Sequence, residues 1–138
     1  MSDPNSIAQL QAAQPPFAQL LGLRVVAATR DRVVSELEVT EAHTNRNGTL
    51  HGGAVMALAD NMGGTATILN IAPEDRTVTV ESKTNFIRAV PLGDIVSAET
   101  TPLHRGRTTM VWQTEITRSD GKLAAIVTQT QLILRPGG

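Results

Sequence analysis

Residues 47–70 read NGTLHGGAVMALADNMGGTATILN, and the rest of the predicted fold is arranged around this segment. A glycine-rich turn leads into a segment without proline that is long enough for about five helical turns. Apolar residues recur in it at spacings of three and four, the period of one helical face. They are Val55, Leu58, Ala59, Met62, Ala66 and Leu69. The pattern predicts one long helix that buries a single apolar stripe.

Three features of this helix depart from ordinary helix composition. His51 and two glycines open it, Asp60 lies in its middle, and Gly63 and Gly64 follow. An interior glycine costs about 1 kcal/mol relative to alanine, and an interior aspartate about 0.5 kcal/mol. Close approach of another backbone explains the glycine pair equally well, and Asp60 could simply face water. Together the departures favour a functional site, because local rules are most often broken where chemistry requires it.

The helix start and Asp60 carry complementary chemistry. The N–H groups of Gly52 and Gly53 lie at the positive end of the helix, which suits a polarised carbonyl or a developing oxyanion. Asp60 is the only carboxylate in the helix, so it is the candidate general base or nucleophile, and the sequence leaves both roles open. Eight residues separate Gly52 from Asp60, which is about 12 Å along a helix. One straight helix cannot bring both to one carbonyl, so we expect a dimer with two sites across its interface.

The motif itself closely resembles a known family. Asn45, the run GTLHGGAVMALAD and the following glycine pair are similar to the hotdog-fold acyl-CoA thioesterases. The nearest group is the phenylacetate-degradation (PaaI) and 4-hydroxybenzoyl-CoA thioesterase type, with the acid on the central helix. The resemblance extends from about Leu21 to Leu134. It implies an α+β hotdog fold, in which an antiparallel sheet of about six strands wraps around one long helix.

The resemblance also implies an activity and an assembly. The chain is expected to hydrolyse a small-molecule acyl-CoA thioester to free acid and coenzyme A. No cofactor is expected, since coenzyme A is part of the substrate. Dimers of this family pair through their sheets and commonly form tetramers, so we expect a homo-oligomer, either a dimer or a dimer of dimers. The acyl group and the biological pathway are not readable from the sequence.

Further site residues follow from the resemblance. Asn45 is expected to help hold the thioester carbonyl or the attacking water, although by position alone it would be a loop-capping residue. Thr79 occupies a place where some relatives position the water, although strand threonines are usually structural. His51 mainly shapes the helix start and touches substrate, and Gly53 lines the same site. Gly64, also assigned to the substrate site, replaces the threonine that other relatives carry one turn after the acid.

A set of basic residues and turn residues resembles the family's segment near the pantetheine and phosphates of coenzyme A. Arginine suits phosphate through its planar fork of donors. Solvated turn charges explain each arginine taken singly, and contact with coenzyme A remains an equal alternative for the group. The group consists of Arg88, His104, Arg105, Gly106 and Arg107.

The rest of the chain fits one domain. Residues 1–20 are expected to form an N-terminal helical segment, either a brace or a cover over the pocket, and residues 21–138 a single hotdog domain. Two strands are predicted before the long helix, at 23–28 and 32–40, and four after it, at 77–88, 95–103, 108–118 and 122–134. Val78, Val80 and Phe86 are candidates for burial in the third strand, and Met110, Trp112 and Ile116 in the fifth. Helices and strands do not alternate, which argues against a Rossmann fold.

Composition excludes several classes of function. The net charge is −1 and only three aromatic residues occur, so nothing favours nucleic acid as a partner. There is no cysteine, and the three histidines at 43, 51 and 104 show no metal-ligand spacing, so no metal is predicted. No secretory signal or membrane-spanning segment is evident, so we expect no membrane association and a cytoplasmic location.

Three other functions compete with hydrolysis. A non-catalytic acyl-CoA-binding hotdog domain would bind the same ligand, but it has no need of a carboxylate near the thioester. A hotdog dehydratase would be expected to use a histidine base in a different glycine–proline setting. A purely structural oligomerisation domain would explain the small residues of the helix but not Asp60.

Overall fold

A computed structural model describes residues 4–137 of the 138-residue chain. Residues 1–3 and 138, at the ends of the expected segments 1–20 and 21–138, lie outside the described residues. The helices and strands, in chain order, are α1 Pro4–Ala12, α2 Pro16–Leu21, β1 Arg24–Ala28, β2 Val33–Glu38, a 3₁₀ turn Glu41–His43, α3 Gly52–Ile68, β3 Arg76–Phe86, β4 Ile95–Arg105, β5 Thr109–Thr117 and β6 Leu123–Leu134.

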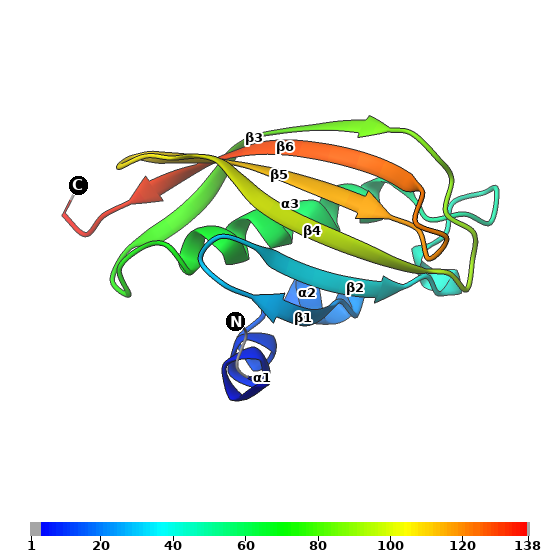
Figure 1. Cartoon of the computed structure of the whole chain (residues 1–138), viewed down its shortest axis with the longest axis horizontal. Coiled ribbons are helices and arrows are strands. Elements are labelled where there is room, and N and C mark those ends of the chain that lie inside the picture. The colour runs from blue at the N-terminus through cyan, green and yellow to red at the C-terminus, as the bar shows by residue number, and fades with distance from the viewer. Residues whose placement is uncertain (1–3, 138) are drawn as a thin grey trace.

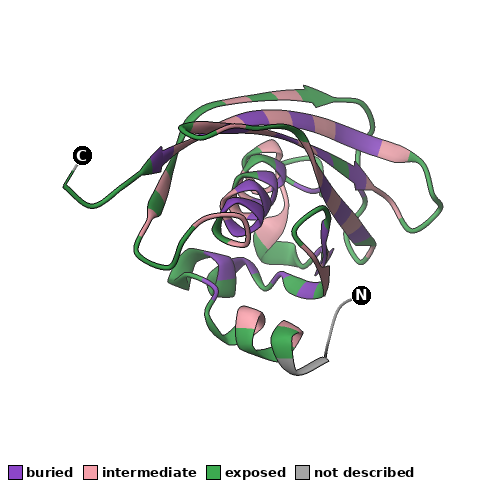
Figure 2. Ribbon diagram, turned by 60° about the vertical axis from the view of Figure 1, so that its left-hand side comes forward, coloured by how far each residue is buried: buried purple, intermediate pink, exposed green. Residues whose placement is uncertain are grey.

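The strands form one sheet, and every neighbouring pair in it is antiparallel. The order of its six strands is β1-β2-β4-β5-β6-β3, so β3 crosses over to the far edge beside β6. The sheet curves around α3, which lies in its hollow (Figures 1 and 2). The α+β hotdog fold, with one long helix wrapped by an antiparallel sheet, is confirmed.

The core forms between one face of α3 and the concave face of the sheet. Leu58, Ala59 and Met62 are at most 1% exposed, as the apolar stripe predicted. Trp112 on β5 is fully buried, and its indole Nε1 donates a 2.8 Å hydrogen bond to the hydroxyl of Thr67 on α3. This bond satisfies the polar atom of the largest core side chain and fixes the helix against the sheet.

One expected set of buried residues is wrong. Val78, Val80 and Phe86 on β3 are 44%, 55% and 57% exposed. Strand β3 lies at one edge of the sheet and, among residues 4–137, pairs with β6 alone, so little of the described chain covers its side chains. Sequence alternation finds the strand but not its place at an edge. The expected burial of Met110, Trp112 and Ile116 on β5 is confirmed.

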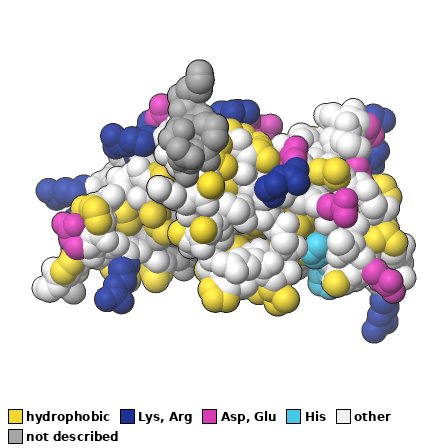
Figure 3. Space-filling model, turned by 90° about the horizontal axis from the view of Figure 1, so that it is seen from below, with side chains coloured by type: hydrophobic (Ala, Val, Ile, Leu, Met, Phe, Trp, Pro, Cys, Tyr) yellow, Lys and Arg dark blue, Asp and Glu magenta, His cyan; other side chains and the backbone are white. Residues whose placement is uncertain are grey.

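The helices α1 and α2 precede the sheet in the chain, and α1 braces the edge opposite to β3. The side-chain amide of Gln11 on α1 donates to the carbonyl of Leu23 (3.2 Å) and accepts from the N–H of Val25 (2.7 Å). Figure 3 views this side from below and shows hydrophobic side chains exposed among charged ones. Phe17 and Leu20 on α2 are both exposed. Among the helices of residues 4–137, none is long and apolar enough to cross a membrane.

Candidate active site

The start of α3 leaves one backbone donor open. His51 is the N-cap, and its Nδ1 accepts the N–H of Gly53 at 2.8 Å. The carbonyl of His51 accepts the N–H groups of Ala54 and Val55. Within residues 4–137 no acceptor meets the N–H of Gly52. The expectation of two free glycine amides is therefore wrong for Gly53, because the side chain of His51 accepts its N–H, and of the two only the N–H of Gly52 is left without an acceptor in the described residues.

Asn45 is bound into its own loop. Its Oδ1 accepts the backbone N–H groups of Asn47 (2.9 Å) and Thr49 (3.1 Å), and its Nδ2 donates to the hydroxyl of Thr49 at 2.9 Å. These bonds hold the turn that leads into α3, which is the loop-capping role weighed in the sequence analysis. The side chain also lines the cleft beside Gly52, so a contact with substrate stays a prediction.

A cleft of about 420 Å³ opens at the start of α3. Its lining includes Leu50, Gly52 and Val55 at the helix start, Phe86 at the end of β3, and Arg88 just after that strand. A Cβ added at Gly52 would lie 3.2 Å from the Phe86 ring, so the glycine lets the ring lie close to the helix start. The open amide of Gly52 thus adjoins a cleft that is partly apolar and partly polar.

Asp60 lies beside a second, smaller cavity. Its side chain is exposed, and its Oδ1 accepts a 2.6 Å hydrogen bond from the hydroxyl of Thr79 on β3. The cavity is about 240 Å³ and is lined by Asp60, Thr79, Gly64 and Ile68, with Pro15 from the N-terminal segment at its wall. Thr79, proposed from the resemblance, is thus brought into direct contact with the acid.

The two interior glycines have different structural roles. A Cβ at Gly63 would lie 2.3 Å from the side-chain carbon Cδ of Gln129, whereas a Cβ at Gly64 would meet nothing within 4 Å. Close approach of another backbone, one of the two alternatives, is not seen within the chain at either position. Gly63 accommodates a side chain of β6, and Gly64 leaves space in the cavity beside Asp60.

Within a single chain the Gly52 amide and the Asp60 carboxylate lie too far apart to contact the same carbonyl group. The helix α3 runs without a break through Gly52 and Asp60, and their separation of about 12 Å follows from its rise per residue. Gly52 lines the larger cleft and Asp60 the smaller cavity, and neither residue lines both.

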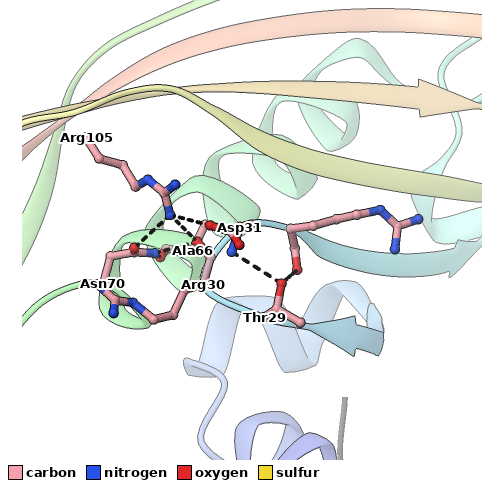
Figure 4. Close-up of polar contacts among 7 residues, drawn as sticks. Thr29, Arg30, Asp31, Ala66, Asn70 and Arg105 are labelled. Carbon is pink, nitrogen blue, oxygen red and sulfur yellow. Dashed lines mark hydrogen bonds and ion pairs between the residues drawn. The ribbon is translucent and has the colours of Figure 1, made fainter. Parts of the chain in front are cut away.

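The basic residues do not form one cluster. Arg88 lines the cleft at the start of α3, where its Nη1 donates to the carbonyl of Leu123. Arg105 lies beyond the other end of α3 and donates to the carbonyl of Arg30 (3.0 Å), to Asp31 (2.7 Å) and to Asn70 (Figure 4).

His104, Gly106 and Arg107 lie in the same turn region as Arg105. A Cβ at Gly106 would lie 2.5 Å from Nε2 of His104, so the imidazole folds over the glycine. Arg107 is exposed, and its carbonyl accepts from Arg135. The strand order separates this turn from Arg88 within one chain, which alternation and turn signals could not reveal. Contact of either part with coenzyme A stays a prediction.

Sequence reasoning missed two buried amides next to the acid. Gln129 and Gln131 on β6 are each 1% exposed, and a hydrogen bond from Gln131 reaches Thr79. Their signal is the polar run Thr128-Gln129-Thr130-Gln131 between apolar parts of the strand, because a polar residue at a core-facing position requires partners.

The residues with shifted pKa values do not line either cavity. A hydrogen bond from the Arg118 guanidinium lowers the pKa of Asp120 to about 2, and a hydrogen bond from Ser119 lowers the pKa of Asp94. Both residues belong to turns at the ends of strands β4, β5 and β6. Within residues 4–137 no group of three or more histidine and carboxylate side chains is placed to hold a metal ion.

Comparison with known proteins places this geometry among thioesterases. The sequence pattern of the thioesterase superfamily matches residues 47–125. A 1,4-dihydroxy-2-naphthoyl-CoA hydrolase of Listeria monocytogenes is 30% identical over 78% of this chain and 87% of its own length.

Solved structures agree with this match. A mutant form of thioesterase PA1618 from Pseudomonas aeruginosa superimposes with a TM-score of 0.88 at 30% identity, over 93% of each chain. The smu.793 protein of Streptococcus mutans, solved with acetyl-CoA bound, has a TM-score of 0.76 at 27% identity, over 82% of this chain and 90% of that one.

Proposed function

The chain belongs to the thioesterase superfamily, and from this premise we propose that it hydrolyses an acyl-CoA thioester by means of Asp60 and the amide of Gly52. The observation that carries the proposal is an exposed carboxylate, oriented by Thr79, on the same helix whose first amide is unpaired. The names of its relatives support coenzyme A thioesters as the substrate class.

The Gly52 N–H would donate to the thioester carbonyl. It lies at the positive end of a 17-residue helix, where the dipole favours the negative charge that develops on the oxygen. The amide is fixed before substrate arrives, because the His51 cap and the Asn45 loop hold the backbone on either side. Preorganised donors of this kind typically contribute about 10²–10³ in kcat.

Asp60 would bring about attack on the carbonyl carbon in one of two ways. As a general base its free Oδ2 accepts a proton from water while the water oxygen bonds to the carbon, and the C–S bond then breaks to release the coenzyme A thiolate, which takes up a proton. As a nucleophile the same oxygen attacks directly, the thiolate leaves, and water hydrolyses the mixed anhydride. The hydrogen bond from Thr79 occupies Oδ1, and no hydrogen bond within the described part of the chain reaches Oδ2, which is available in either case.

Both groups would meet across an interface between two chains. The free edge of β3 supports this, because it is eleven residues long and carries the exposed Val78, Val80 and Phe86. An exposed apolar edge strand invites pairing with another chain. The other edge strand, β1, is five residues long and is braced by Gln11. Pairing of β3 with β3 of a second copy would bring two α3 helices together, so that Asp60 of each could approach the Gly52 end of the other.

Thiol release from a panel of aromatic, short-chain and medium-chain acyl-CoAs tests the proposal. The chain has no cysteine, so a thiol reagent reports only the released coenzyme A. Asp60→Asn should lower kcat by about 10²–10⁴ and retain the fold. Glu74→Gln, which neutralises an exposed carboxylate in the loop after α3, should turn over like the wild type. Binding of acyl-CoA without turnover by the wild type would instead establish the non-catalytic binding domain.

A further inference from the structure

Two buried glutamines form a hydrogen-bonded path between the backbone of α3 and Thr79. We propose that Gln131, held in one orientation by Gln129, is a positioning residue that directs the Thr79 hydroxyl proton toward Asp60. The inference rests on the proposed function of Asp60. It assigns a role to Gln129 and Gln131, neither of which contacts the acid itself.

The path begins at a group that can only accept. The carbonyl of Ala59 accepts a 2.8 Å hydrogen bond from Nε2 of Gln129, which fixes the Gln129 amide with its oxygen on the other side. That oxygen in turn accepts from Nε2 of Gln131. The orientation of Gln131 is therefore set by a backbone carbonyl one residue before Asp60.

The second hydrogen of the Gln131 amide reaches Thr79. Nε2 of Gln131 donates to the Thr79 hydroxyl at 2.6 Å, and the Gln131 oxygen accepts from the hydroxyl of Thr77 at 2.7 Å. The Thr79 oxygen is thus an acceptor from Gln131, and its single proton is left for Oδ1 of Asp60, 2.6 Å away. If the Gln131 amide were reversed, its oxygen would compete with Asp60 for that proton.

Burial and packing hold the path in place. Gln129 and Gln131 are each 1% exposed, so water does not offer them alternative partners. Gln129 lies against Gly63, where any Cβ would come within 2.3 Å of its Cδ. The absence of a side chain at Gly63 therefore has a specific structural role, because it leaves room for Gln129, the first glutamine of the path.

Steady-state kinetics with Gln131→Met tests the proposal. Methionine keeps the length of the side chain and removes its donors and acceptor. The loss of one positioned donor should lower kcat by about 10- to 100-fold with a much smaller change in KM, because the carboxylate acts in the transition state. The decisive arm is the double variant with Thr79→Ala. If Gln131 acts through Thr79, adding Gln131→Met to Thr79→Ala should cause no further loss.

Two further variants guard against a general effect on the core. Thr114→Val removes another buried hydroxyl, which pairs with Thr100 at 2.6 Å and is no part of the path, and it should leave kcat unchanged. Gln129→Met should lower kcat less than Gln131→Met, and this loss too should disappear in the Thr79→Ala background. If Gln131→Met does not fold, Gln129→Met alone and combined with Thr79→Ala serves as the test. Additive losses in the double variants would overturn the proposal.

A readout without turnover separates this inference from the proposed function. The side-chain amide signals of Gln131, identified in NMR spectra by their absence in Gln131→Met, should move in Thr79→Ala and stay in place in Thr114→Val. Unchanged Gln131 signals in Thr79→Ala would overturn the path whatever the enzyme activity. If the signals move in Thr79→Ala as expected but the wild type cleaves no acyl-CoA, the proposed function is overturned and the path is established.

Discussion

The hydroxyl of Thr79 donates a 2.6 Å hydrogen bond to Oδ1 of Asp60, joining two residues 19 positions apart in the sequence. Thr79 lies on β3, the edge strand, and Asp60 on α3, so the bond orients the acid from outside its own helix. A carboxylate in the middle of an exposed helical face could otherwise take several rotamers. The contact gives the acid one bound oxygen and one free oxygen.

Thr79→Val should lower kcat by about 10- to 100-fold, because valine keeps the shape and the β propensity of threonine but has no proton to donate. Thr79→Ser keeps the hydroxyl and should retain most of the activity. Equal losses in both variants would show that the methyl group and not the hydrogen bond matters. Initial rates at saturating acyl-CoA measure the effect, with circular dichroism as the check on folding.

The adjacent glycines of α3 give opposite predictions for stability. Gly64→Ala adds a Cβ in open space and should raise the free energy of unfolding by up to about 1 kcal/mol through helix propensity. Gly63→Ala places its Cβ against the buried, hydrogen-bonded side chain of Gln129 and should lower it by about 1–3 kcal/mol. Urea titrations at one fixed protein concentration compare the two.

A larger substitution at Gly64 tests which cavity holds the acyl group of the substrate. The residue lines the cavity beside Asp60, so a larger side chain there, as in Gly64→Val, should reduce kcat/KM for bulky acyl-CoAs more than for acetyl-CoA. A uniform loss across the panel would mean that the acyl group does not enter this cavity.

The long helix and the number of strands were predictable because periodicity reports burial within a chain. The motif from His51 to Asp60 contains the two groups of the candidate site, the open amide of Gly52 and the carboxylate of Asp60. The exposure of Val78 and Val80 was not predictable, because alternation does not say which strand lies at the edge of a sheet. The occupied amide of Gly53 depends on the rotamer of His51, which no sequence pattern encodes.

The separation of Arg88 from Arg105 depends on long-range strand order in the same way. In the sequence, Arg88 and Arg105 share only their position near the end of a strand. The antiparallel strands place them at opposite ends of α3. The path from Gln129 to Thr79 likewise needs the register of β6 against β3, which pairs Gln131 with Thr79. Local signals identify polar residues in a strand, and only the register identifies their partners.

The open amide at the start of α3 can be removed without breaking the helix. Gly52 is the first helical residue, a position that accepts proline, and His51 before it has the extended backbone that a following proline requires. Gly52→Pro should therefore lower kcat by about 10²–10³ with the fold retained. Gly52→Ala adds a Cβ against Phe86 but keeps the N–H, and it should retain far more activity. Comparable losses in both would attribute the effect to crowding of Phe86.

Mixing two inactive variants tests whether the site is shared between chains. Asp60→Asn lacks the acid and Gly52→Pro lacks the amide donor, so each homodimer has two defective sites. A heterodimer concentrates both defects in one site and leaves the other intact. After subunit exchange between equal amounts, activity should recover to about a quarter of the wild-type value, since half of the dimers are mixed and each has one working site. A mixture that stays as inactive as its components, with exchange verified by mass spectrometry of the intact dimers, would show that Asp60 of one chain and Gly52 of another do not form one site.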